Sequence, residues 1–173
     1  MKRDPLIELI LQNAQALNKL QDDIKHTAKK RAENEQSLKE WKEACRLFHE
    51  ALDLVFPGGL SKQLELLKKH DPTTIDNAIT YLKADPYYFR SGYIKQEMLR
   101  RLKQAPLTHK QIIQLQDILI DVIQRTGRRE NREYYRLAAK IADEKFRARI
   151  QEIMQNSKDP QITNRAQQML DKL

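Results

Sequence analysis

The arginine-rich stretch around residue 130 is the part of the sequence whose residue types and spacing could do chemistry. Seven residues form this candidate surface: Arg125, Arg128, Arg129, Arg132, Tyr135, Arg136 and Lys140. At about 100° per residue, the four cations from Arg129 to Lys140 fall on one helical face. Arginine presents a planar fork of donors to phosphate oxygens, and the ring of Tyr135 could stack on an unpaired base. The pattern predicts a surface for an anionic partner such as a nucleic acid.

A second interpretation of the same stretch is an ordinary solvated or protein-facing helix surface. Glu133 lies four residues after Arg129 and three before Arg136, so it can form ion pairs with both. The apolar side chains lie roughly opposite the cations and would anchor the helix: Tyr134, Leu137, Ala138 and Ile141. Because Glu133 can neutralise part of the row, we favour this second interpretation.

Catalytic and metal-binding patterns are weak in the remainder of the sequence. Cys45 and His49 are four residues apart and could form a thiolate–imidazole contact, but Cys45 also continues an apolar row between Leu38 and Leu52. The sequence contains no glycine-rich phosphate loop, no HExxH motif, no EF-hand and no zinc-ligand spacing. We therefore expect no catalytic residues, no metal and no cofactor, and a protein that is not an enzyme.

Five aromatic residues gather within thirteen positions: Tyr81, Tyr87, Tyr88, Phe89 and Tyr93. Such a group could line a groove for a peptide, because aromatic side chains are enriched at binding hot spots. It could equally form a core seam between adjacent helices with its hydroxyls reaching the surface, and we favour this alternative.

The composition indicates an all-α protein. The 173 residues include only 4 Gly and 6 Pro, whereas sandwiches, barrels and parallel α/β sheets need frequent turn residues. One cysteine excludes an internal disulfide framework, and no apolar run approaches the ~20 residues that span a bilayer. We expect a soluble, cytoplasmic protein. Residues 90–150 hold 15 basic and 7 acidic side chains, which accounts for the whole net charge of +8.

Aspartate–proline pairs predict where helices begin, because Asp caps the first free N–H groups and Pro suits the first helical position. The sequence contains four such pairs, beginning at Asp4, Asp71, Asp85 and Asp159. Between Pro5 and Pro57 there is no Gly or Pro, and apolar residues recur at heptad spacing. Two alternatives fit this segment: one helix about 75 Å long, or a hairpin that turns near residues 29–35. The missing Gly and Pro favour the continuous helix.

The Pro57-Gly58-Gly59 triplet is the clearest break in the chain. We expect a long amphipathic helix or helical hairpin in residues 1–56 and a compact multi-helical domain in residues 60–173. Ser61 could cap a first short helix, and Thr108 with Gln111 forms a capping-box pattern for a strongly apolar core helix. The predicted helices of this domain cover 61–69, 72–83, 86–104, 108–125, 129–141, 144–156 and 160–172.

The C-terminal part of the chain resembles a HEAT-type helical repeat, most closely over residues 144–173 and loosely over 60–173. Asp159, Ile162, Ala166 and Leu170 match the second helix of that repeat, whereas Thr163 replaces its arginine. The resemblance implies a HEAT-like α-solenoid: a scaffold that binds proteins or nucleic acids and performs no chemistry.

The leading functional prediction is a non-enzymatic, protein-binding helical scaffold. Its partner would be another protein, or a second copy associating in coiled-coil fashion through residues 5–56. The alternative is a nucleic-acid-binding protein that uses the basic surface of residues 90–150. A third alternative is peripheral attachment of the basic helices to anionic lipid.

Overall fold

The computed structural model describes residues 4–125 and 130–173. Over these residues the chain forms nine α-helices and no β-strand, which confirms the all-α prediction. The helices are α1 (Pro5–Ala28), α2 (Glu35–Leu54), α3 (Leu60–Lys68), α4 (Pro72–Ala84), α5 (Ser91–Gln104), α6 (His109–Gln124), α7 (Asn131–Ile141), α8 (Glu144–Asn156) and α9 (Pro160–Leu170). No helix in the described ranges combines the length and the apolar character needed to cross a bilayer.

The chain divides into two compact units. Unit 1 comprises Met1–Lys69 and Thr80–Ser91, and unit 2 comprises His70–Ile79 and Gly92–Leu173. The helix α4 therefore contributes residues to both units. The break predicted at residues 57–59 lies inside unit 1, where it separates α2 from α3.

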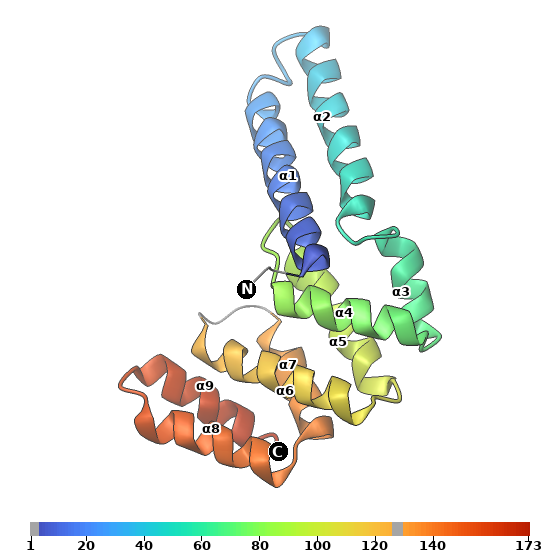
Figure 1. The fold of residues 1–173 in the computed structure, drawn as a ribbon. Coiled ribbons are helices and arrows are strands. Elements are labelled where there is room, and N and C mark those ends of the chain that lie inside the picture. The colour runs from blue at the N-terminus through green and yellow to red at the C-terminus, as the bar shows by residue number, and fades with distance from the viewer. Residues whose placement is uncertain (1–3, 126–129) are drawn as a thin grey trace. The chain divides into compact units, whose positions relative to one another are not determined.

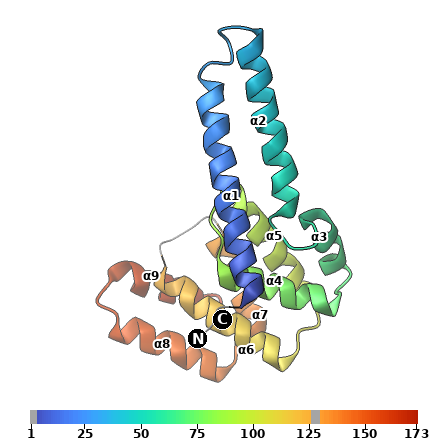
Figure 2. The same ribbon diagram turned by 45° about the horizontal axis from the view of Figure 1, so that its top comes forward.

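Helices α1 and α2 form a hairpin and lie side by side in both ribbon views (Figures 1 and 2). The favoured continuous helix is wrong, and the hairpin alternative is correct. The side chain of Asn34 accepts a hydrogen bond of 2.8 Å from the backbone N–H of Ser37 and so caps α2 without Gly or Pro. Folding back buries the apolar rows of both helices against each other, and this burial outweighs the continuity of one helix. The buried residues are Ile10, Ala14 and Leu17 of α1 and Ala44 and Phe48 of α2.

The remainder of unit 1 is held by buried aromatic side chains. The rings of Phe56 and Tyr81 lie 5.4 Å apart between centroids, and the Tyr81 hydroxyl contacts that of Tyr88. Helix α3 starts at Leu60 after Gly59, whose φ of 88° suits glycine. Ser61 is therefore not the cap that we predicted. Instead, the carboxylate of Asp53 accepts a hydrogen bond of 2.9 Å from the Ser61 N–H.

Unit 2 is built around α6, which contacts α7, α8 and α9. Its capping box is confirmed, because Thr108 and Gln111 exchange backbone–side-chain hydrogen bonds. Leu115, Leu119 and Ile123 of α6 are buried, whereas Ile113 is exposed, so one side of this helix faces solvent. Helices α8 and α9 lie side by side, joined by a short link (Figure 1).

Three of the four Asp-Pro predictions are confirmed. Asp4, Asp71 and Asp159 each accept a backbone N–H in the first turn of α1, α4 and α9. The prediction at Asp85 is wrong, because residues 85–90 form a loop and α5 begins at Ser91. Asp85 has a φ of 49°, in the left-handed region, which turns the chain out of a helical path. The loop allows Tyr88 to be buried beside Tyr81.

Candidate functional site

Helix α7 carries the described part of the predicted cationic surface. Its predicted anchoring side is confirmed, since Tyr134, Leu137, Ala138 and Ile141 are all buried. Arg132, Arg136 and Lys140 are exposed on the other side. Arg125 follows the end of α6, 3.9 Å from the carboxylate of Asp121. Arg128 and Arg129 lie outside the described residues.

Tyr135 does not lie on the exposed side of α7. It is only 8% exposed, and its hydroxyl is 3.5 Å from the side-chain oxygen Oε1 of Gln168 on α9. Burial raises the pKa of the Tyr135 phenol. A base-stacking platform needs an open ring face, and the ring of Tyr135 is covered.

Glu133 neutralises part of the cationic row. Its side chain is buried, and its carboxylate lies 2.8 Å from the Arg136 guanidinium and 3.7 Å from that of Arg100 on α5. The predicted pairing of Glu133 with Arg136 is therefore confirmed. A guanidinium that already shares a buried carboxylate gains less from a phosphate than a free one does.

Lys140 caps the C-terminal end of α5. Its ammonium donates to the backbone carbonyl oxygen of Ala105, at 3.3 Å, and to that of Lys103. The last carbonyls of a helix have no intrahelical partner, so a cation at this position satisfies them and complements the helix dipole. Sequence spacing could not reveal this role, because more than thirty residues separate Lys140 from its acceptors.

A buried ion pair near the start of α7 escaped the sequence analysis. Lys95 of α5 has no exposed surface, and its ammonium lies 3.5 Å from the carboxylate of Glu130. The signal that could have found it is the position of Lys95 on an apolar helical stripe, between Ile94 and Met98. Both charged groups are withdrawn from water, which makes the pair a structural element of unit 2 and not a docking surface.

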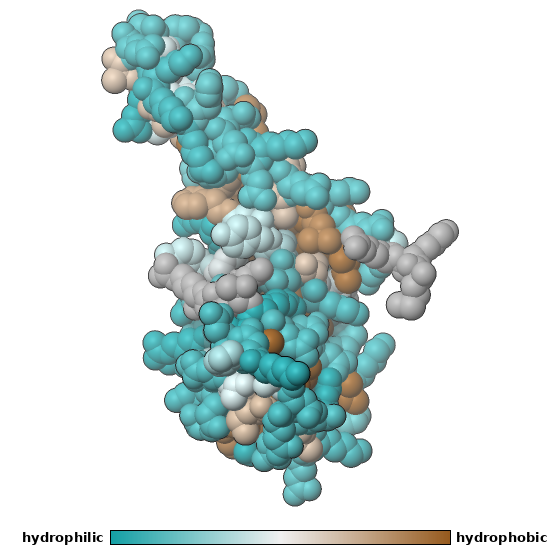
Figure 3. All heavy atoms as spheres, turned by 90° about the vertical axis from the view of Figure 1, so that its left-hand side faces the viewer, coloured by the Kyte–Doolittle hydropathy of each residue, from teal (hydrophilic) through white to brown (hydrophobic). Residues whose placement is uncertain are grey.

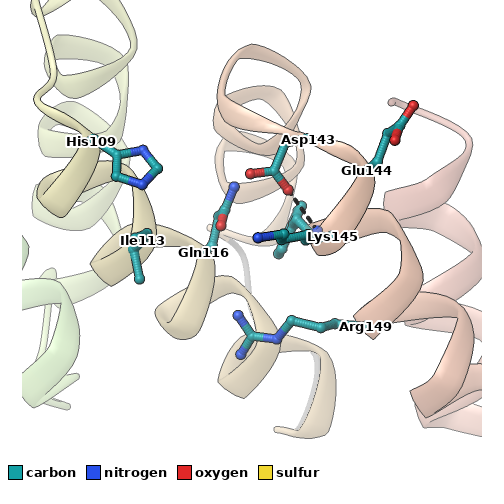
Figure 4. A pocket seen from close by; sticks show the side chains of 8 residues that line it. His109, Ile113, Gln116, Asp143, Glu144, Lys145 and Arg149 are labelled. Carbon is teal, nitrogen blue, oxygen red and sulfur yellow. Dashed lines mark hydrogen bonds between the residues drawn. The ribbon is translucent and has the colours of Figure 1, made fainter.

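A cavity of about 540 Å³ lies between α6 and α8 in unit 2 (Figure 4). Its polar lining includes His109 and Gln116 from α6, Asp143 at the N-cap of α8, and Lys145 and Arg149 within α8. Asp143 caps α8 by accepting the Phe146 N–H at 2.7 Å, and this hydrogen bond lowers the pKa of the Asp143 carboxyl.

Most of the side chains that line this cavity are polar or charged. Arg149 is 2.8 Å from the carboxylate of Asp117, so its charge is compensated within the protein. Among the described residues, no group of three or more His, Cys, Asp and Glu side chains could hold a metal ion.

The aromatic cluster divides into buried and exposed members. Tyr81 and Tyr88 belong to the core of unit 1, as the favoured interpretation requires. Tyr87, Phe89 and Tyr93 are exposed. The ring of Phe89 lies 6.1 Å from that of Phe48 on α2, which extends the apolar surface of the hairpin.

The α1–α2 hairpin carries a row of leucines that we call the leucine face: Leu9, Leu47 and Leu54, which are exposed, and Leu20, which is half-buried. The side chain of Asn13 donates a 2.9 Å hydrogen bond to the carbonyl oxygen of Leu54, which sets the antiparallel register. Since Leu20 follows Asn13 by seven residues and Leu47 precedes Leu54 by seven, this register places Leu20 opposite Leu47. Figure 3 shows separate hydrophobic patches on the otherwise mostly hydrophilic surface of the hairpin, and a mostly hydrophilic tip.

The leucine face is open to solvent. Leu47 is 40% exposed, Leu54 66% and Leu9 42%. A groove of about 490 Å³ lies between the two helices here, with Leu20, Ala44 and Leu47 in its lining.

Comparisons with models of known families, with curated proteins and with solved structures found no match to this chain.

Proposed function

We propose that the chain is a non-enzymatic interaction module that binds another protein through the leucine face of the α1–α2 hairpin. The observation that carries this proposal is the exposure of Leu47 and Leu54 one above the other on α2. Among the described residues, five of the seven large exposed hydrophobic side chains belong to unit 1. These five are Leu9, Leu47, Leu54, Tyr87 and Phe89.

Exposed leucines at helical spacing favour association with an apolar partner. Full burial of one leucine contributes about 1.5–3 kcal/mol relative to its exposed state. Isolated exposed leucines are ordinary on protein surfaces, whereas a contiguous row with a groove is typical of a binding surface. The two helices are fixed by their own buried rows, so the face is already formed before a partner arrives.

The runner-up proposal is nucleic-acid binding by the basic surface of residues 90–150. It is supported by the local charge excess and by the exposure of Arg132 and Arg136. It is weakened by the burial of Tyr135 and by the contacts of Lys140 with backbone carbonyls. The geometry therefore favours a protein partner.

The likeness to a HEAT repeat belongs to the same proposal. It is supported by the side-by-side arrangement of α8 and α9 and by the buried positions of Ala166 and Met169 on α9. Arg165 lies two residues after the position where the repeat carries its arginine, and its Nε donates a 2.8 Å hydrogen bond to the carbonyl oxygen of Ile123. A scaffold of this kind would present its helices to a partner and would not itself catalyse a reaction.

The test compares proteins captured by the immobilised full chain with those captured by a Leu47→Glu/Leu54→Glu variant. The matched control is Ile113→Glu, which adds one carboxylate at an exposed apolar position of unit 2. We expect the wild type and the control to retain the same proteins and the double variant to lose them. Circular dichroism verifies that all three remain helical. Equal capture by the double variant would refute the role of the leucine face.

A second measurement separates the two candidate functions. Binding of purified protein to RNA and DNA is measured at two salt concentrations, with an Arg129→Ala/Arg132→Ala/Arg136→Ala variant beside the leucine variant. Phosphate contacts make binding fall steeply with salt, and loss of three cations flattens that dependence. Salt-sensitive binding that is lost in the arginine variant and kept in the leucine variant would establish the runner-up.

A further inference from the structure

The groove between α1 and α2 has an apolar floor and an acidic rim. Leu20, Ala44 and Leu47 supply the floor. Three carboxylates stand around them, Asp23 from α1 and Glu40 and Glu43 from α2, against one ammonium, that of Lys39. Because Glu40 and Glu43 lie seven and four residues before Leu47, they share its side of α2.

The carboxylates of this groove are unequally neutralised. Glu43 pairs with Arg46 through a 2.8 Å hydrogen bond, and the guanidinium holds the pKa of the Glu43 carboxyl below its usual value. Lys39 is itself held by Glu35 at 2.9 Å. Glu40 accepts a hydrogen bond from the amide of Gln36 at 3.0 Å, and neither Glu40 nor Asp23 has a cationic partner among the described residues. Two carboxylates are therefore left for an external cation.

The sign of this groove is opposite to that of the whole chain, which carries a net charge of +8. Complementary charge favours an occupant that is positive around its apolar residues. A symmetric dimer through this groove is disfavoured, because a two-fold axis brings the same patch of both copies together. Such a contact would bring together two patches of the same negative sign, and like charges repel.

The dimensions of the face suit a helical occupant. Leu47 and Leu54 are seven residues apart, about 10 Å along α2, and Leu9 and Leu20 are separated by about 16 Å along α1. A helix with apolar residues at positions i, i+3 or i+4 and i+7 covers such a distance with one stripe. Its polar flanks would then lie against the carboxylates on either side of the groove.

We propose that the occupant of this groove is a basic amphipathic helix of a partner protein, with leucine-like residues against Leu20 and Leu47 and Lys or Arg against Asp23 and Glu40. This inference rests on the proposed function and names the class of partner that it requires. Apolar burial supplies most of the affinity, and the carboxylates select a basic partner over an acidic one.

The test uses the full chain and a fluorescent 18-residue peptide made of Leu and Lys with one apolar stripe. Two comparison peptides separate the contributions of charge and shape. One replaces every Lys by Glu, and the other keeps the composition but scrambles the stripe. We expect anisotropy titrations to show binding of the Leu/Lys peptide that is at least about tenfold tighter than that of either comparison peptide. Hydrogen exchange should show peptide-dependent protection within residues 20–47.

Two variants assign the binding to the groove. Asp23→Asn/Glu40→Gln removes both unpaired carboxylates without changing side-chain size, and we expect about fivefold weaker binding of the Leu/Lys peptide. The matched control, Glu33→Gln/Glu65→Gln, removes two exposed carboxylates of unit 1 outside the groove and should leave the affinity within about twofold. Leu47→Ala should weaken binding without altering its salt dependence.

Each other outcome overturns the inference. If the Leu/Glu peptide or the scrambled peptide bound as tightly as the Leu/Lys peptide, the occupant would not need to be basic and amphipathic. Equal loss in the control variant would show non-specific attraction. A dimer in light scattering that disappears in Leu47→Glu would identify a second copy as the occupant. If the Leu/Lys peptide does not bind but the Leu47→Glu/Leu54→Glu variant still loses a captured protein, the inference fails and the proposed function stands.

Discussion

The side-chain nitrogen Nδ2 of Asn13 lies 2.9 Å from the backbone carbonyl oxygen of Leu54. This hydrogen bond joins α1 to the last residue of α2, where a carbonyl has no partner within its own helix. It therefore stabilises the end of α2 and the antiparallel register that aligns the leucine face.

We expect Asn13→Ala to lower the free energy of unfolding by about 1 kcal/mol, because the Leu54 carbonyl loses its side-chain donor. Urea denaturation followed by circular dichroism measures this change. Gln15→Ala, at an exposed position of the same helix, is the matched control and should change stability by less than about 0.5 kcal/mol. Equal effects of the two substitutions would show that the hydrogen bond contributes nothing beyond helix propensity.

The buried pair of Lys95 and Glu130 should be costly to break from one side. Glu130→Gln or Lys95→Met alone removes one member of this buried ion pair, a change that typically costs about 3–5 kcal/mol. The double variant should lose less than the sum of the two single losses, and urea denaturation of all four proteins gives the coupling.

The pair of Lys25 and Asp22 is the control for this double-mutant cycle. The Lys25 ammonium lies 2.9 Å from the Asp22 carboxylate, and both side chains are exposed to solvent. We expect its coupling to be below about 1 kcal/mol. Additive losses at Lys95 and Glu130 would contradict the buried ion pair.

Asp71 should make part of the stability depend on pH. Hydrogen bonds from the backbone N–H of Thr74, then from its hydroxyl, hold the pKa of the Asp71 carboxyl below its usual value. A carboxyl with a lowered folded-state pKa adds stability above its unfolded-state pKa, about 3.9, and loses that stability as the pH falls through the lower folded value.

Asp71→Asn keeps a capping oxygen but cannot titrate. We therefore expect its melting temperature to fall less steeply than that of the wild type as the pH is lowered from 5 to about 2. Asp76→Asn, at an exposed position on the same helix, serves as the comparison. If the melting temperature of Asp71→Asn falls as steeply with decreasing pH as that of the wild type, other groups control the acid sensitivity.

Gly92 lies against the buried carboxylate of Glu130. A Cβ at this position would stand 3.0 Å from Glu130 Oε2, closer than ordinary contact. Because Glu130 is paired with Lys95, its carboxylate cannot easily move away from an added methyl group. We therefore expect Gly92→Ala to destabilise unit 2 by about 1–3 kcal/mol, despite the better helix propensity of alanine.

Shortening the carboxylate tests this steric origin. Adding Glu130→Asp to Gly92→Ala should make the alanine less costly than it is in the wild-type background, measured by urea denaturation. An unchanged cost in the two backgrounds would place the strain elsewhere.

Helix starts were predictable because their determinants are local. Asp4, Asp71 and Asp159 cap through N–H groups two or three residues ahead, and Thr108 does so with Gln111. The same local pattern failed at Asp85, since burial of Tyr88 beside Tyr81 holds residues 85–90 in a loop. The sequence likewise favoured a continuous helix over the hairpin, because the turn contains neither Gly nor Pro. The hairpin is selected by the burial of Leu17 and Phe48.

The sequence alone predicted a cationic row opposite an apolar side in residues 129–141 and heptad apolar rows in residues 5–56, but those rows did not include Leu9, Leu47 or Leu54. Only the tertiary structure decided which side chains remain at the surface. Tyr135 is covered and contacts Gln168, and Lys140 binds the carbonyl of Ala105, whereas Leu47 and Leu54 stay exposed. The physical reason is distance along the chain. Helical periodicity assigns each residue to a side of its own helix, but burial and ion pairing depend on neighbours brought from more than thirty residues away.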